Sequence, residues 1–219
     1  MRSIPGRVLV ATRNGGKALE LRDAAAALRL RPVTLDEVGV PPHPAEAALE
    51  GGDTFAANAV AKARWFHSRT GLPTLGDDSG LVVAALNGAP GVHSRRWVGA
   101  VGTEHEVTAA NNEALLRAMA GVADRSAAFV CVLAFVDGDT ELLASGTVEG
   151  RIAGAPRGAH GFGYDPLFEP DDLPGRTFAE VQPGEKRRVS HRARAAAALA
   201  QQLAGATGQQ ARTTTRAPR

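Results

Sequence analysis

Residues 8–17 have the sequence VLVATRNGGK, and this stretch decides the fold class of the 219-residue chain. Its first five residues form a short, mostly apolar run, which favours a buried β-strand. The run breaks at residues 13–16, and residues 17–30 then carry leucines among good helix formers, which predicts a helix. A strand, a glycine-containing turn and a helix in this order open an α/β domain.

The rest of the chain alternates between helical and extended patterns. Thr103 and Glu106 form a capping box at the start of one helix, and Asp53 or Thr54 caps an earlier one. Residues 39–53 are rich in Pro, Gly and Glu and indicate a loop. Two apolar runs around an Asp-Gly-Asp turn predict a β-hairpin. The expected helices span residues 17–30, 55–66, 103–120 and 190–203, and the expected strands span 8–12, 72–75, 81–86, 127–136 and 141–152, with a polar turn at 77–80.

Composition indicates one domain with a polar tail. Hydrophobic residues make up 44% of the chain, enough for a sizeable core. Residues 1–204 contain no repeat or linker and are expected to form a single domain, whereas residues 205–219 are expected to be disordered. The pI of about 9.1 depends on that tail, because without its three arginines the formal net charge falls from +2 to −1. We therefore expect no nucleic-acid partner.

The sequence also predicts a soluble, cytoplasmic protein. Cys131 is the only cysteine, so no internal disulfide is possible, and in an apolar run it is expected to be a small buried hydrophobe. The apolar run at residues 8–11 is too short for a secretory signal. No segment has the roughly 20 apolar residues that cross a bilayer, so we expect no membrane association.

Lysine is rare in this chain, since only Lys17, Lys62 and Lys186 stand beside 22 arginines. The two side chains are not equivalent at a phosphate or a metal, so a position that kept lysine is a candidate for a site that needs it. Lys17 and Lys186 fall in candidate sites described below. Lys62 lies on the expected helix 55–66 without an assigned role.

The first candidate site lies between the first strand and the first helix. Free backbone N–H groups and the helix dipole favour an anion there, and Lys17 adds a full charge. The segment differs from a P-loop, because Ala11 replaces the first glycine and Ala18 replaces the Ser or Thr after the lysine, which argues against a P-loop kinase. An ordinary strand-to-helix turn is the alternative. The candidate triphosphate ligands are Thr12, Arg13, Asn14, Gly15, Gly16 and Lys17.

The second candidate site is the pair Asp77 and Asp78. Adjacent carboxylates repel each other unless a cation or donors neutralise them. Mg²⁺ binds a few carboxylates together with water and substrate phosphates, and such a carboxylate can also activate a water molecule. Glu50, in the loop before the second helix, is a candidate partner ligand. The alternative is a solvated acidic turn.

Two later segments carry groups that suit a nucleoside. Residues 161–165 (GFGYD) combine glycines, which let a backbone approach a ligand, with Phe162, which can stack on a base. Residues 186–192 (KRRVSHR) lead into a helix, and their Arg and His donors suit a keto oxygen. The alternatives are a glycine-rich turn with buried aromatic rings and a solvated charged helix start.

In this order the motifs resemble those of the inosine triphosphate pyrophosphatase family, over residues 7–203. The matching motifs are Thr12-x-Asn14-x-x-Lys17, residues 50–55 (EGGDTF) with Asn58-Ala59 and Lys62-Ala63, residues 77–81 (DDSGL), residues 88–92 (GAPGV) with Ser94, Arg95 and Trp97, residues 156–158 (PRG), residues 161–166 (GFGYDP), and residues 190–192 (SHR).

The resemblance implies hydrolysis of deaminated purine nucleoside triphosphates (ITP, dITP, XTP) to the monophosphate and pyrophosphate, with Mg²⁺. It implies an α/β fold with a long mixed central sheet, flanking helices and two lobes around a cleft, in a homodimer. Asp78 would be the general base and, with Glu50, a metal ligand. Ser79 would join residues 12–17 at the triphosphate. The nucleoside would contact Phe162, Gly163, Tyr164, Asp165, Lys186, His191 and Arg192.

The chain departs from the family's pattern at three positions: Ala57 stands where Glu is frequent, Gly76 where Ala is usual, and Ala193 where Gly is common. The loss of Glu at Ala57 is expected to weaken electrostatics at a metal or a helix terminus. Two alternatives remain open. One is a less selective, Maf-like pyrophosphatase. The other is a nucleotide- or nucleic-acid-binding module without catalysis, which the basic segment favours and the paired aspartates oppose.

Overall fold

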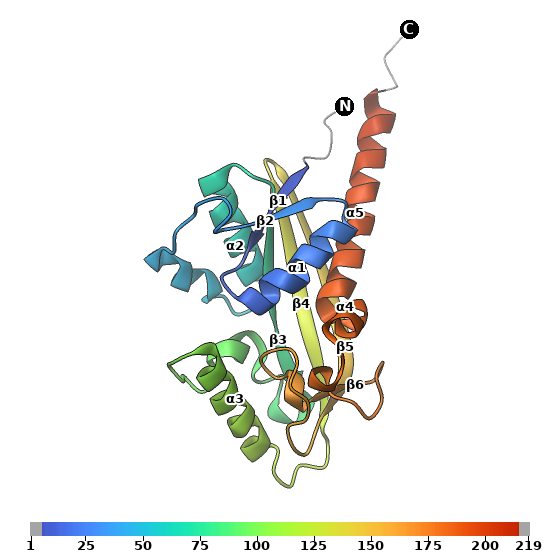
Figure 1. The fold of residues 1–219 in the computed structure, drawn as a ribbon. Helices are drawn as coiled ribbons and strands as arrows, with labels where there is room; N and C mark the ends of the chain where they lie inside the picture. Colours follow the sequence, from blue (N-terminus) through green and yellow to red (C-terminus); the bar gives the residue numbers. More distant parts are fainter. Residues whose placement is uncertain (1–5, 215–219) are drawn as a thin grey trace.

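The computed structural model describes residues 6–214 as one mixed β-sheet with flanking helices (Figure 1). The strand order is β2-β1-β3-β4-β5-β6, with β1 parallel to β2 and β3 and the other pairs antiparallel. The predicted α/β class with a mixed sheet is therefore confirmed. The strands are β1 (Arg7–Ala11), β2 (Arg31–Thr34), β3 (Thr74–Val83), β4 (Ser126–Asp137), β5 (Thr140–Ile152) and β6 (Phe168–Pro170).

The helices begin largely where capping residues predict. Thr54 caps α2 by accepting a hydrogen bond from the Ala57 backbone, and Thr103 and Glu106 form the expected capping box of α3. The α-helices are α1 (Gly15–Ala27), α2 (Phe55–Thr70), α3 (Glu104–Ala118), α4 (Pro183–Val189) and α5 (His191–Thr214), and the 3₁₀ helices are η1 (Pro44–Glu50), η2 (Ala84–Leu86), η3 (Gly91–Arg96), η4 (Asp165–Leu167) and η5 (Phe178–Glu180).

The prediction of a polar turn at residues 77–80 is wrong. These residues lie in the middle of β3, which runs without a break from Thr74 to Val83 and pairs with β4 along its whole length. Asp77 faces Leu133 and Asp78 faces Val132 in that register. The carboxylates are tolerated inside a strand because cations from three helices neutralise them, a compensation that the local sequence does not show.

Other expectations also differ from the structure. The strand expected at residues 81–86 ends at Val83, and residues 84–86 form η2. The first helix ends at Ala27, and residues 31–34 form β2, which the sequence reasoning missed because the strand is short and contains Pro32. Residues 44–50 form η1 rather than loop, since His43 caps a turn that starts at Pro44. Residues 205–214, for which the sequence predicted disorder, continue α5. Residues 215–219 of that tail lie outside the described part of the chain.

The helices cover both faces of the sheet (Figure 1). On one face α1 and α5 pack through Leu21, Ala195 and Leu199 against β1, β3 and β4. On the other face α2 packs through Ala59, Ala63 and Phe66. A further apolar cluster joins α3, the far ends of β3 to β5 and residues 164–181. The long strands β3, β4 and β5 run through both halves of the molecule and hold them together.

No helix within residues 6–214 is long and apolar enough to span a membrane.

Candidate active site

The candidate site is a pocket of about 320 Å³ beside the middle of β3. Strand β1 pairs with β3 only as far as Ala11 opposite Gly76, and the next bridge on that side joins Val82 to Pro90. Between these two points Asp78, Ser79 and Gly80 line the pocket. The sequence-predicted residues that line it are Thr12, Arg13, Asn14, Lys17, Glu50, Asp78, Ser79, Phe162, Gly163, Tyr164, Asp165, Lys186, His191 and Arg192.

Gly15 and Gly16 are not among the lining residues. Gly15 is the first residue of α1, and Gly16 lies under the Phe162 ring, where an added Cβ would come within 2.6 Å of the ring. Gly16 therefore lets the start of α1 approach the segment that carries Phe162.

The N-terminus of α1 is held by its own side chains. Asn14 is the N-cap residue, and its Oδ1 accepts a hydrogen bond from the Lys17 backbone at 2.8 Å. The Lys17 ammonium lies 2.8 Å from an Asp77 oxygen. Arg13 binds Glu46 and the carbonyls of Val40 and Pro41, so its guanidinium anchors η1 rather than facing the pocket centre.

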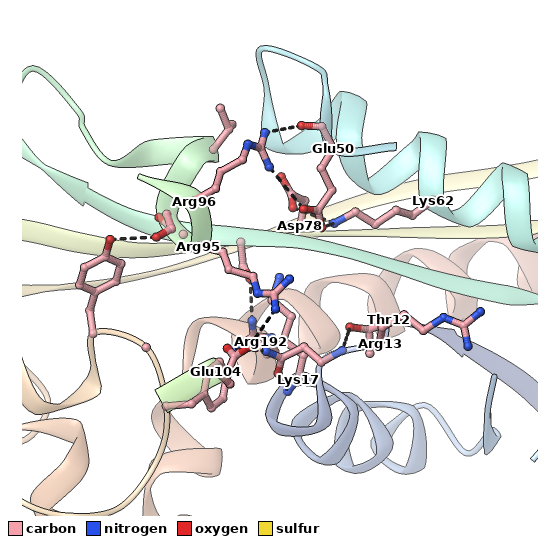
Figure 2. A pocket seen from close by; sticks show the side chains of 18 of the residues that line it. Thr12, Arg13, Lys17, Glu50, Lys62, Asp78, Arg95, Arg96, Glu104 and Arg192 are labelled. Carbon is pink, nitrogen blue, oxygen red and sulfur yellow. Dashed lines mark hydrogen bonds and ion pairs between the residues drawn. The ribbon is translucent and has the colours of Figure 1, made fainter. Parts of the chain in front are cut away.

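Lys62 joins the two carboxylates that were expected to bind a metal (Figure 2). Its ammonium lies 2.8 Å from Glu50 Oε1 and 2.9 Å from Asp78 Oδ1, and it also donates to the Asp77 carbonyl. Asn58 donates to the other Asp78 oxygen at 2.9 Å, and Arg96 contacts the other Glu50 oxygen at 3.3 Å. Burial lowers the pKa of Lys62, but Asp78 and Glu50 outweigh this and raise it, so the ammonium is charged.

The carboxylates of Glu50 and Asp78 lie close enough together to contact the same Lys62 ammonium. Such a pair also fits the ligand chemistry of a divalent metal. Mg²⁺ commonly takes one or two protein carboxylates and completes its shell with water and substrate phosphates. Glu50 and Asp78 both line the pocket, where a phosphate could supply the remaining oxygens. Within residues 6–214 no group of three or more His, Cys, Asp or Glu side chains is arranged to hold a metal by itself. The donor set therefore fits a metal that shares its ligands with a substrate.

Asp77 has a different environment from Asp78, because neighbouring residues of a strand point to opposite faces. Asp78 faces α2, whereas the fully buried Asp77 side chain contacts Lys17 of α1 and Arg192 of α5. Cys131 donates its S–H to the same carboxylate at 3.2 Å. Burial raises the pKa of Asp77, but Arg192 and Lys17 lower it well below its usual range. Asp77 is thus a permanent anion that organises cations.

Lys186 joins another pair of carboxylates behind the pocket. Its ammonium lies 2.8 Å from Glu20 of α1 and 2.6 Å from Asp165. Asp165 also accepts a hydrogen bond from the Phe162 backbone, so this cluster fixes the segment that carries the Phe162 ring. The Lys186 ammonium lies 4.7 Å from the centre of that ring. Burial raises the pKa of Glu20, but Arg192 and Lys186 lower it to about 2.

The guanidinium of Arg192 fixes the tautomer of His191. Arg192 Nη1 lies 3.2 Å from His191 Nε2, and because a guanidinium only donates, Nε2 must accept and the proton must lie on Nδ1. Burial and Arg192 lower the pKa of His191 well below its usual range, which keeps the ring neutral. Nδ1 is buried and has no hydrogen-bond partner in the described part of the chain. His191 thus lines the pocket as a neutral ring whose Nδ1 is buried and unpaired among the described residues.

Two predicted nucleoside ligands have their polar atoms engaged within the protein. Arg192 donates to Glu20 Oε2 at 2.6 Å and to Ser79 Oγ at 2.6 Å. The Tyr164 hydroxyl donates to the Ser94 carbonyl at 2.8 Å, which ties residues 161–165 to η3. Both residues line the pocket, but their polar atoms form hydrogen bonds with neighbouring protein groups.

Sequence reasoning missed several residues that contact the predicted set. Lys62 was left without a role, although Asn58 and Lys62 are four apart and share one face of α2, a spacing that links them to the same target. Glu20 follows Lys17 by one turn of α1, but nothing local shows that it meets α4 and α5. Arg95 belongs to a matching motif but was given no role, and the other charged pocket residues that were missed are Glu46, Arg96 and Glu104.

A sequence model of the Ham1 family matches residues 8–202. A dITP/XTP pyrophosphatase of Mycolicibacterium paratuberculosis is 50% identical over 193 residues, which cover 86% of this chain and 91% of the relative. A second protein of that name, from Ralstonia nicotianae, is 44% identical over 200 residues, 90% of this chain and 96% of the relative. The solved structure of a HAM1 protein from Coxiella burnetii is similar with a TM-score of 0.73 at 40% identity, covering 91% of this chain and 98% of that chain. On this sequence and structural similarity, the chain belongs to the Ham1 family.

Proposed function

We propose that this protein hydrolyses deaminated purine nucleoside triphosphates (ITP, dITP and XTP) to the monophosphate and pyrophosphate, with Mg²⁺ as cofactor. One observation carries the proposal: the same pocket is lined by the carboxylate pair Glu50 and Asp78, by the N-terminus of α1, and by His191, whose buried Nδ1 has no partner among the described residues. The relatives named dITP/XTP pyrophosphatase support the same substrates.

Asp78 is the group that accepts the proton of the attacking water. Lys62 and Asn58 each donate to one of its oxygens, which fixes the plane of the carboxylate and stabilises its charge. Attack at the α-phosphorus expels pyrophosphate, so negative charge builds up on the leaving group. Lys17, at the start of α1, is placed to neutralise that charge together with the free N–H groups of the helix.

Glu50 and Asp78 would hold the metal through the oxygens that now contact Lys62, Asn58 and Arg96. Bound there, Mg²⁺ would neutralise part of the charge of the triphosphate. Lys62 remains beside both carboxylates and orients them.

Base selectivity follows from the tautomer of His191. Hypoxanthine and xanthine present a keto oxygen at position 6, which accepts a hydrogen bond from Nδ1–H. Adenine presents an amino group there, so two donors would face each other in a buried site. Phe162, half-buried and lining the pocket, is the ring on which the base would stack.

A pyrophosphate-release screen tests the proposal. We expect rapid release from dITP and XTP, much slower release from dATP and dGTP, and loss of activity in EDTA. Similar rates on the four standard deoxynucleotides would favour a less selective, Maf-like enzyme. Binding of dITP without turnover would favour the non-catalytic module. A cytoplasmic homodimer stays a prediction from the resemblance, and sedimentation equilibrium tests its oligomeric state.

A further inference from the structure

Glu104 lines the pocket and contacts residues at the start of α1 and in η3 (Figure 2). It is the first residue of α3, and its Oε1 accepts a hydrogen bond from Asn14 Nδ2 at 3.1 Å. Its other oxygen accepts from Arg95 Nη2 of η3 at 3.0 Å. One carboxylate thus joins an amide at the N-terminus of α1 to a guanidinium on the opposite wall.

This ion pair is more exposed than the others in the pocket. Lys62, Lys186 and Arg192 each contact at least two carboxylates and are nearly buried. The Arg95 side chain is 67% exposed and the Glu104 side chain 47% exposed. An exposed pair of this kind contributes little net stability, so a competing anion can replace the carboxylate at small cost.

The donors around Glu104 suit a phosphate as well as they suit a carboxylate. A guanidinium and a side-chain amide both donate to phosphate oxygens. Asn14 is the N-cap of α1, where the helix dipole also favours an anion. The Glu104 carboxylate therefore occupies a position where the surrounding donors could also bind a phosphate.

We propose that Arg95 is a further triphosphate-binding residue and that Glu104 occupies its phosphate position until the nucleotide arrives. The incoming phosphate takes over the Asn14 amide and the Arg95 guanidinium, and the Glu104 side chain turns out to solvent. The inference rests on the proposed function, because it assumes a substrate with a triphosphate.

Variants at the two positions have opposite predicted effects. Glu104→Gln keeps a hydrogen-bond acceptor for Asn14 but removes the competing charge, so KM for dITP should fall about two- to fivefold while kcat stays the same. Arg95→Ala removes a charged donor, so KM should rise about tenfold. In the Arg95→Ala background the gain from Glu104→Gln should disappear, because no guanidinium is left to be released. Glu113→Gln removes the same charge from α3 in an exposed i,i+4 pair outside the pocket and serves as the control.

Inhibition by inorganic tripolyphosphate and by dIMP separates phosphate binding from a structural role. Arg95→Ala should weaken inhibition by tripolyphosphate and leave inhibition by dIMP unchanged. The inference is overturned if Glu104→Gln behaves like Glu113→Gln, if Arg95→Ala changes neither KM nor tripolyphosphate inhibition, or if it weakens both inhibitors equally. If the wild-type protein does not hydrolyse dITP, the proposed function fails, and calorimetric titration of the same variants with tripolyphosphate still tests Arg95 and Glu104.

Discussion

Lys62 and Lys186 each join two carboxylates that come from different elements of the fold. Lys62 lies between Glu50 and Asp78, and Lys186 lies between Glu20 and Asp165. A compact ammonium on a flexible stem can approach two acidic groups from one point, whereas a planar guanidinium needs a fixed fork of acceptors. The third lysine, Lys17, contacts Asp77 in the same pocket region. All three lysines of the chain therefore lie at one site, among 22 arginines.

Glu20 is the carboxylate whose pH dependence can be measured. Its folded-state pKa is about 2 against an ordinary value of 4.5, so the ionised form stabilises the fold. That contribution is complete above about pH 4.5 and is lost as the pH falls toward 2. We expect Glu20→Gln to lower the free energy of unfolding by on the order of 3 kcal/mol at pH 7 and to flatten its dependence on pH between 5 and 3. Urea unfolding followed by circular dichroism measures both effects.

Glu113→Gln is the matched control for this change, because Glu113 is exposed on α3 and contacts only Arg117 among the described side chains. Parallel stability–pH curves for Glu20→Gln and the wild-type protein would contradict the assignment of Glu20 as a buried anion.

Helix α2 begins with half of a capping box. The Thr54 hydroxyl accepts a hydrogen bond from the Ala57 backbone, but Ala57 has no side chain to return a bond to the Thr54 backbone. Ala57→Glu should complete the box and raise the free energy of unfolding by about 0.5–1 kcal/mol, and Ala57→Gln should give a smaller gain since it lacks the charge that favours the helix N-terminus. Thermal unfolding tests this, and an unchanged melting temperature for both variants would argue against it.

The packing of α2 on β3 depends on Gly76. A Cβ at Gly76 would lie far inside van der Waals contact with the Ala59 carbonyl and 2.9 Å from the Ala63 nitrogen, both backbone atoms of α2. Gly76, where the family pattern usually has Ala, thus allows a close helix–strand contact. Gly76→Ala should force α2 outward, lowering stability by about 1–3 kcal/mol.

The same variant should also lower kcat, because Asn58 and Lys62 would move away from Asp78. Gly154→Ala is the control, since a Cβ there meets no atom within 4 Å. If Gly76→Ala loses no more stability and activity than Gly154→Ala, the close contact does not position the site.

At the scale of the whole molecule, the pocket lies between two apolar clusters. The long strands β3, β4 and β5 contribute residues to both clusters and so connect them. One cluster packs α1 and α5 on the sheet, and the other joins α3 to residues 164–181. Polar contacts join the two sides of the pocket, among them Asn14 to Glu104 and Glu50 to Arg96. A ligand that contacts both sides should therefore stabilise the fold as a whole.

Asp78→Asn allows this to be measured without turnover. With Mg²⁺ present, dITP at about 100 times its Kd should stabilise the variant by about 2.7 kcal/mol, which raises its Tm by about 5–10 °C. At the same concentration dATP should raise Tm less, because its amino group meets the His191 donor. Pyrophosphate release should be absent while circular dichroism matches the wild type. Equal Tm shifts with both nucleotides would contradict the role of His191, and retained turnover would contradict that of Asp78.

Much of the fold followed from local patterns. The first strand and helix, the caps at Thr54 and Thr103, and the hairpin of β4 and β5 depend on residues that are neighbours in sequence. The predictions failed where distant contacts override local preference. Asp77 and Asp78 have a turn-like sequence, yet pairing with β4 and cations from α1, α2 and α5 keep them in a strand.

The sequence by itself determined the α/β class, the helix starts at Thr54 and Thr103, and the residue types that gather in the pocket. Only the tertiary structure decided which acidic side chain pairs with which basic side chain. Arg192 and Asp77 are 115 residues apart, and Glu20 and Arg192 are 172 apart. Because β3 points its two aspartates to opposite faces, one is fixed by α1 and α5 and the other faces α2 and the pocket. The energy of a buried charge depends on the distance to its partners, and that distance is set by how the layers pack rather than by sequence order.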